Sequence, residues 1–224
     1  MAELQTIARI RSPFAEKFGI PRQSGVVEAV RATVVFEPTY RNPDAVRGLE
    51  GFSHIWLIWQ FSQAVRDDWS PTVRPPRLGG NRRMGVFATR SPFRPNAIGL
   101  SSVRLDRVEL DPELGPVLHV SGADLMDGTP IFDIKPYLPY TDSHPEASGG
   151  FTDGTAMERL TVNFPPELLD QFDPDQRAGL LGVLESDPRP RYQDEPARIY
   201  GLSFAGRNVK FTVDGEALTV LEVE

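Results

Sequence analysis

Proline and glycine recur along the whole chain and limit the length of any regular element. The 224 residues include 21 Pro and 19 Gly, and neither type is confined to one segment. Frequent turns favour short strands over long helices. We therefore expect a mainly β or α+β protein built from many short elements.

Strand patterns fill most of the first 140 residues. We predict strands over residues 7–10, 29–37, 54–61, 101–110, 117–120 and 131–135. The run at 54–61 is apolar on both faces, as in a strand buried on both sides or in a barrel. The alternation of residues 101–110 changes phase after Leu105, which predicts a β-bulge.

The strand at 131–135 carries a charged pair. Alternation puts Ile131, Asp133 and Lys135 on one face and turns Phe132 and Ile134 towards the core. A solvated ion pair on an outer sheet face is the simpler alternative for Asp133 and Lys135.

Three further local predictions concern short segments. Residues 84–88 are apolar and predict a short buried strand, and Asn42 followed by Pro43 predicts a short helix that ends near Gly51. A lone histidine such as His54 is more often a hydrogen-bonded core residue than a catalyst.

The last third of the chain has a different pattern. We expect a first domain over residues 1–145, a polar linker over 146–155 and a C-terminal α+β domain over 156–224. Within that domain, Asp173 and Pro174 predict a capping box and a helix to residue 185, and strands are expected near 200–204, 209–213 and 218–220.

Composition excludes several kinds of chemistry. The chain has no cysteine, which rules out disulfides, thiolate nucleophiles and cysteine zinc sites, and its three histidines are scattered, so no metal is expected. The N-terminus has no signal-peptide pattern, and no apolar run approaches the ~18 residues of a membrane span. We therefore expect a cytoplasmic protein without a membrane partner.

Positive charge is concentrated in one stretch. Residues 74–107 contain eight arginines and a single acid, Asp106, although the whole chain has a net charge of −7. This asymmetry predicts an anion-binding surface, although a solvated arginine-rich loop is the simpler alternative. The arginines are Arg74, Arg77, Arg82, Arg83, Arg90, Arg94, Arg104 and Arg107.

Sequence motifs of common nucleotide enzymes are missing. No P-loop is present, and no G-x-G-x-x-G stands between a strand and a helix. The available arginines, carboxamides, hydroxyls and few acids suit a reaction in which two bound molecules react directly while the protein orients them.

Four segments closely resemble the TsaA-like domain of the TrmO family over about residues 5–145. They are KFGIPRQ, HIWLIWQF, RPPRLGGNRRMGVFATRSPFRPNAIGLS and DGTPIFDIKPYLPYTD. The resemblance implies a small closed β-barrel, unlike the Rossmann-type methyltransferases, that works as a homodimer. It also implies a methyltransferase that uses S-adenosyl-L-methionine (SAM) to methylate N6 of N6-threonylcarbamoyladenosine, next to the anticodon of threonine tRNA.

The resemblance also implies a cofactor site. Family members often have His where this chain has Ser62, so only a main-chain contact is carried over there. The implied residues are Pro21, Arg22, Gln23, Ser62, Gln63, Arg90, Leu100, Asp127, Gly128, Thr129 and Pro130.

For the substrate we expect Asp133, Lys135 and Tyr137 to be catalytic, with Tyr140 behind them. The acceptor nitrogen belongs to a urea and needs a base, but the sequence does not decide between Asp133 and Lys135. We further expect the basic stretch to contact RNA phosphates. The residues expected to do so are Arg74, Arg77, Arg82, Arg83 and Arg94.

Two alternatives remain open at the level of sequence. One is a non-catalytic RNA-binding β-barrel that grips single-stranded RNA with its basic loop and aromatic residues. The other is a methyltransferase of the same fold with a different acceptor.

Overall fold

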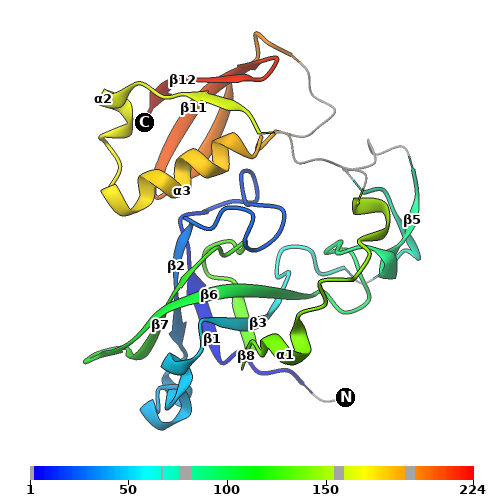
Figure 1. Cartoon of the computed structure of the whole chain (residues 1–224), viewed down its shortest axis with the longest axis vertical. Coiled ribbons are helices and arrows are strands. Elements are labelled where there is room, and N and C mark those ends of the chain that lie inside the picture. The colour runs from blue at the N-terminus through cyan, green and yellow to red at the C-terminus, as the bar shows by residue number, and fades with distance from the viewer. Residues whose placement is uncertain (1–2, 67, 76–81, 154–158, 190–194) are drawn as a thin grey trace.

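The computed structural model describes residues 3–66, 68–75, 82–153, 159–189 and 195–224. Six strands close into an antiparallel barrel in the order β1-β2-β7-β6-β3-β8 (Figure 1). Closure leaves no unpaired sheet edge in this unit. The strands are β1 (Ala8–Arg11), β2 (Arg31–Phe36), β3 (His54–Gln60), β6 (Ile98–Asp111), β7 (Gly115–Ser121) and β8 (Pro130–Pro136).

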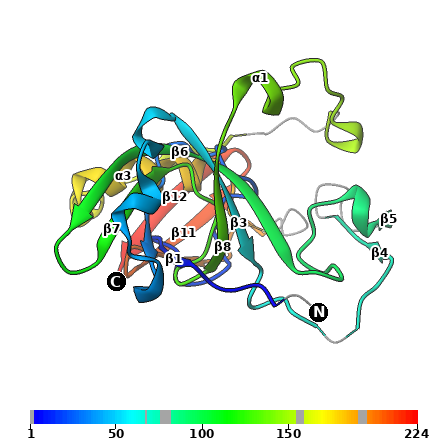
Figure 2. The ribbon, with the colours of Figure 1, turned by 90° about the horizontal axis from the view of Figure 1, so that it is seen from below.

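Short elements connect the barrel strands. Figure 2 shows β4 and β5, a two-stranded ribbon, projecting from the side of the barrel. The connecting elements are β4 (Thr72–Val73), β5 (Met84–Gly85) and the 3-10 turns Pro38–Tyr40, Pro43–Val46, Leu49–Gly51 and Val86–Ala88. After the last barrel strand come α1 (Pro139–Asp142) and the 3-10 turn Gly150–Thr152.

Alternation fills the barrel interior. Ile55, Leu57 and Trp59 of β3 are buried, and the residues between them are half-buried on the outer face. The strand is therefore fully buried on one face and partly buried on the other. His54, at its exposed start, contacts Ser53, so the expectation of a core histidine is wrong.

Two bulges shape the barrel. The predicted bulge in β6 is confirmed, because the pairing with β7 shifts register between Leu105 and Arg107. A second shift, opposite β3, leaves Phe132 as an extra residue in β8 between the paired Ile131 and Asp133. Ile131 and Ile134 consequently both contact the barrel core. The prediction that Phe132 faces the core and Ile131 shares the face of Asp133 is wrong, because the bulge changes the phase.

Two other local predictions need correction. Residues 84–88 do not form a buried strand: β5 ends at Gly85, a 3-10 turn follows, and only Val86 of that turn is buried while Phe87 is 72% exposed. A short apolar run does not by itself distinguish a strand from a helical turn. Asn42 does cap a helical turn through its side chain at Asp44 N, but residues 43–51 form two 3-10 turns instead of one helix.

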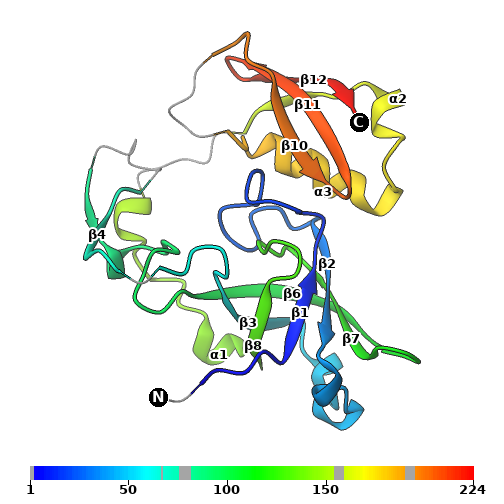
Figure 3. The same cartoon turned by 180° about the vertical axis from the view of Figure 1, so that it is seen from behind.

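The C-terminal unit is a four-stranded sheet with a helix on one face, as Figures 1 and 3 show. The predicted helix and three strands are confirmed, whereas β9 and α2 were not predicted. Asp173 precedes the helix, but its side chain makes no capping hydrogen bond. The elements are β9 (Thr161–Asn163), α2 (Pro166–Leu169), α3 (Pro174–Glu185), β10 (Tyr200–Phe204), β11 (Arg207–Asp214) and β12 (Ala217–Val223).

The chain between β1 and β2 joins the two units. Three of its side chains are buried outside the barrel, in the hydrophobic core of the C-terminal unit: Phe14, Val27 and Val30. Phe14 packs edge-on against Phe204 with ring centroids 5.6 Å apart, and Ala205 N donates to Pro13 O at 2.8 Å. In Figure 3 this segment, in blue, lies between the barrel and the C-terminal sheet.

We predict that Gly99→Ala destabilises the barrel. Gly99 pairs with Trp59 across β6 and β3, and a Cβ at this position would lie 2.3 Å from Trp59 Cε2. Overpacking of this kind costs about 1–3 kcal/mol of unfolding free energy. Chemical denaturation measures the change. Gly85→Ala is the matched control, since no atom lies within 4 Å of its added Cβ; equal stability of the two variants would contradict the prediction.

Candidate functional site

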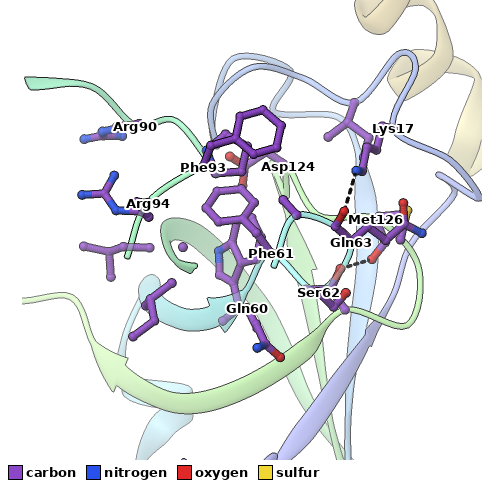
Figure 4. A pocket seen from close by; sticks show the side chains of 18 of the residues that line it. Lys17, Gln60, Phe61, Ser62, Gln63, Arg90, Phe93, Arg94, Asp124 and Met126 are labelled. Carbon is purple, nitrogen blue, oxygen red and sulfur yellow. Dashed lines mark hydrogen bonds between the residues drawn. The ribbon is translucent and has the colours of Figure 1, made fainter. Parts of the chain in front are cut away.

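A cavity of about 810 Å3 opens on the barrel where four segments meet (Figure 4). The chain before β2 supplies Lys17 and Pro21, the end of β3 leads into Phe61, the arginine-rich stretch supplies Arg90, and the chain after β7 supplies Asp124. The volume lies within the roughly 300–1,000 Å3 of small-molecule sites. In Figure 4, Arg90 and Arg94 approach from one side and Lys17 and Met126 lie on the other.

The structure brings most of the predicted cofactor residues together. Asp127, Gly128 and Pro130 are not part of the lining. Their turn is tied to β1, because Ser12 N donates to Asp127 Oδ1 at 3.0 Å and Arg9 Nη1 donates to Gly128 O at 3.1 Å. The predicted residues that line the cavity are Pro21, Arg22, Gln23, Ser62, Gln63, Arg90, Leu100 and Thr129.

Side-chain hydrogen bonds hold the basic groups of the cavity in place. Arg90 Nη1 donates to Gln23 Oε1, which links the arginine-rich stretch to the loop before β2. Lys17 Nζ donates to Gln63 O at 3.2 Å and Arg94 Nη1 donates to Thr89 O at 3.1 Å. Positive side chains therefore stand on opposite walls.

Asp124 is the one acid among the described residues of the lining, and the sequence analysis missed it. Ser101 Oγ donates to Asp124 Oδ1 at 2.6 Å, and Trp59 Nε1 donates to Ser101 Oγ at 3.0 Å. Burial raises the pKa of the Asp124 carboxyl, against the opposing effect of the Ser101 hydrogen bond. A single acid between the buried apolar residues Ala123 and Leu125 is the signal that could have indicated it.

The predicted catalytic residues lie apart from this cavity. Asp133 and Lys135 form an ion pair at 3.1 Å, with side chains 47% and 62% exposed, on the outer face of β8. Exposed pairs contribute little to stability. The structure thus has the solvated ion pair on an outer sheet face that was the simpler alternative for these two residues. Tyr140 is 86% exposed on α1.

Tyr137, which directly follows β8, lines a second cavity of about 470 Å3 on the outer face of β3 and β6. His54, Trp56, Ser102 and Asp142 line the same cavity. Arg90 and Leu100 line both cavities, so the two are neighbours.

The arginines expected to contact RNA are placed unequally. Arg74, Arg82 and Arg83 are exposed, and Arg83 Nη1 donates to Thr72 Oγ1 at 3.3 Å. Arg94, in contrast, is half-buried and lines the first cavity. Arg77 lies outside the described residues.

No metal site is evident in the part of the chain that the structure describes, since it contains no group of three or more His, Asp or Glu side chains placed to hold an ion. Nor does any described helix have the length and apolarity to span a membrane.

Comparisons with known proteins cover both units. The tRNA-methyltransferase O N-terminal domain matches residues 9–143, and the TrmO C-terminal domain matches residues 157–224. A tRNA (adenine(37)-N6)-methyltransferase of Escherichia coli K12 is 41% identical over 99% of this chain and 97% of the relative. A Pseudomonas aeruginosa relative, provisionally named as an S-adenosylmethionine-dependent methyltransferase, is 45% identical over 88% of this chain and 86% of its own length. The crystal structure of TrmO from Pseudomonas aeruginosa superposes with a TM-score of 0.79 at 34% identity, covering 100% of this chain and 99% of that one.

We predict that Asp124→Asn stabilises the protein at neutral pH. A carboxyl whose pKa is raised by folding binds its proton more tightly in the folded state, so its contribution to stability falls as pH rises above the unfolded value. The amide avoids this cost and still accepts from Ser101. Thermal unfolding from pH 4 to pH 8 should show a variant advantage that grows with pH. A constant or inverted difference would contradict the assignment.

Proposed function

The chain belongs to the tRNA-methyltransferase O family, and on that premise we propose that it is a SAM-dependent enzyme that methylates N6 of adenosine 37 in tRNA. The observation that carries the proposal is the match of both family domains, with a relative of that activity aligned over 99% of the chain.

The first cavity suits the cofactor by its charges. SAM carries a carboxylate, an ammonium and a sulfonium, and when bound it supplies an electrophilic methyl group. Arg90 and Arg94 would hold the carboxylate, since arginine pairs with carboxylates through two parallel hydrogen bonds. Asp124, the one acid of the lining, would face the positive groups. Main-chain groups of Gln63 and the loop at Pro21 would bind the remainder.

The chain's own residues orient the reactants and exclude water. Methyl transfer is a direct displacement, so the protein needs no nucleophile of its own, and positioning alone can contribute about 7–11 kcal/mol. Asp133 and Lys135 stay candidates for the proton of the acceptor nitrogen, because Lys135 pairs with Trp56 across β8 and β3, beside the second cavity.

We extend the proposal with the finer features that the resemblance of the four sequence segments implies. The acceptor is N6-threonylcarbamoyladenosine in the anticodon loop of threonine tRNA, the enzyme is a homodimer, and a tRNA substrate implies a cytoplasmic location. The exposed Arg74, Arg82 and Arg83 contact tRNA phosphates.

The proposal predicts the enzymatic activity itself. The purified protein should transfer the labelled methyl group of SAM to threonine tRNA isolated from cells that make threonylcarbamoyladenosine. Nuclease digestion and mass spectrometry of the product should place the label on the nucleoside at position 37. tRNA from a strain that lacks the threonylcarbamoyl group is the control. Equal labelling of both RNAs would reject threonylcarbamoyladenosine as the required acceptor. The absence of label from both RNAs would reject the proposal that the protein is a tRNA methyltransferase.

We expect some arginines to bind the cofactor and others to bind RNA. Arg90→Ala should weaken SAM binding about 10- to 100-fold, since a charge-assisted hydrogen bond contributes roughly 1.5–3 kcal/mol. Arg82→Ala should leave the Kd for SAM unchanged and lower the slope of log Kd for tRNA against log salt by about one. Calorimetry with SAM and tRNA binding at several salt concentrations measure the two effects. Equal effects of both variants on SAM binding would contradict this division.

A further inference from the structure

The second cavity has a wall in common with the cofactor cavity. Arg90 and Leu100 line both, and Leu100 is 54% exposed between them on the outer face of β6. Two bound molecules that react directly must lie side by side. The second cavity is therefore in the right place for the acceptor.

Aromatic rings form the walls of the second cavity. The Trp56 and Tyr137 centroids are 5.6 Å apart with ring planes inclined by 41°, and the His54 ring lies 6.1 Å from that of Tyr137. All three rings are at least partly accessible to solvent. Across β6 the small residue Ser102 pairs with Trp56. The small side chain of Ser102 thus leaves space beside the indole.

The polar edge of Trp56 is already engaged. Its Nε1 donates to Asp142 Oδ2 at 3.0 Å, and the same oxygen accepts from Leu138 N at 2.8 Å. These bonds fix α1 over the end of β8 and fix the indole plane. The indole is thus held in the lining of the cavity beside the Tyr137 ring, where a flat ring could stack.

We propose that this cavity receives the acceptor adenine, turned out of the RNA loop and stacked on Trp56 and Tyr137. The inference rests on the proposed function and names the binding site of its second substrate. Enzymes that modify a base turn it out of the stack and hold it against aromatic side chains. An anticodon-loop nucleotide is single-stranded, so this step costs less than in a duplex.

The positive charge around the cavity favours RNA as the occupant. Arg90 borders it, and Arg104 is exposed on β6, the strand that carries Ser102. The acid in the lining, Asp142, is already an acceptor for two donors, and the Leu138 N–H and the Trp56 N–H keep its pKa below the usual range. Asp142 therefore stays a carboxylate that these two bonds hold beside Trp56 and Leu138, and contact with RNA phosphate is left to the arginines.

The test compares ring-removing variants. Tyr137→Leu and Trp56→Leu should each reduce kcat/KM for threonine tRNA about 10- to 100-fold, the usual effect of losing a base stack. The Kd for SAM, measured by calorimetry, should stay close to that of the wild type. Tyr137→Phe, which keeps the ring, should lose much less than Tyr137→Leu. The Kd for an anticodon stem-loop RNA that carries the modified adenosine, measured by fluorescence anisotropy, should rise in the same order as kcat/KM falls.

The control is Tyr40→Leu, another half-buried ring of the barrel that lines neither cavity, and it should retain the wild-type kcat/KM. Wild-type kcat/KM in both folded leucine variants would overturn the inference. So would an equal loss of SAM affinity, which would assign the cavity to the cofactor, or a changed oligomeric state in light scattering, which would assign it to a subunit contact. Failure of the wild type to methylate any tRNA would reject the proposed function, while RNA binding by the variants would still test the cavity.

Discussion

Burial of Phe14, Val27 and Val30 in the C-terminal core is the interaction on which the candidate site depends. The chain between β1 and β2 has few regular elements, and hydrogen bonds such as that from Gly25 N to Gly122 O at 2.9 Å tie it to the barrel without burying its apolar side chains. Burying each of these side chains contributes roughly 1.5–3 kcal/mol. Gly19 in the same segment lies so close to Leu202 that an added Cβ would be 2.0 Å from it. The C-terminal unit thereby forms the support behind Pro21 and Gln23, although none of its described residues belongs to the lining of the first cavity.

The other side of the cavity is held by the barrel core. Trp59 points inward from β3, lies against Gly99 of β6 and donates to Ser101, which donates in turn to Asp124. A buried core residue and the acid of the cavity are thus members of one hydrogen-bonded chain. Such a chain leaves Asp124 little freedom to rotate, and its burial explains the raised pKa. Two separate cores therefore hold the residues of one site in place.

The sequence predicts where the strands and helices of this fold lie better than it predicts which face of a strand each side chain occupies. Alternation and turn residues predicted the strands, the helix at residues 174–185 and the bulge after Leu105, because those signals are local. The bulge at Phe132 depends on pairing with β3, which is distant in sequence, so it could not be read from residues 131–135 alone. The same limit applies to the site. Motif resemblance indicated Arg90 and Gln63, whereas Asp124 becomes a cavity residue only when the barrel closes and buries it beside Ser101.

Charge then decides which face an RNA can approach. Residues 1–140 hold 17 basic and 15 acidic side chains, a balance of +2, whereas residues 141–224 hold 7 and 16, a balance of −9. A polyanion is repelled by the C-terminal unit and attracted by the barrel. On the barrel, the exposed Arg74, Arg82 and Arg83 belong to the same stretch of chain as Arg90, which borders both cavities. One stretch of chain thus supplies both the arginines that attract the RNA backbone and Arg90, the side chain between the two cavities. An RNA loop held there by its phosphates would have the cavity at Trp56 and Tyr137 beside it in which to place a base.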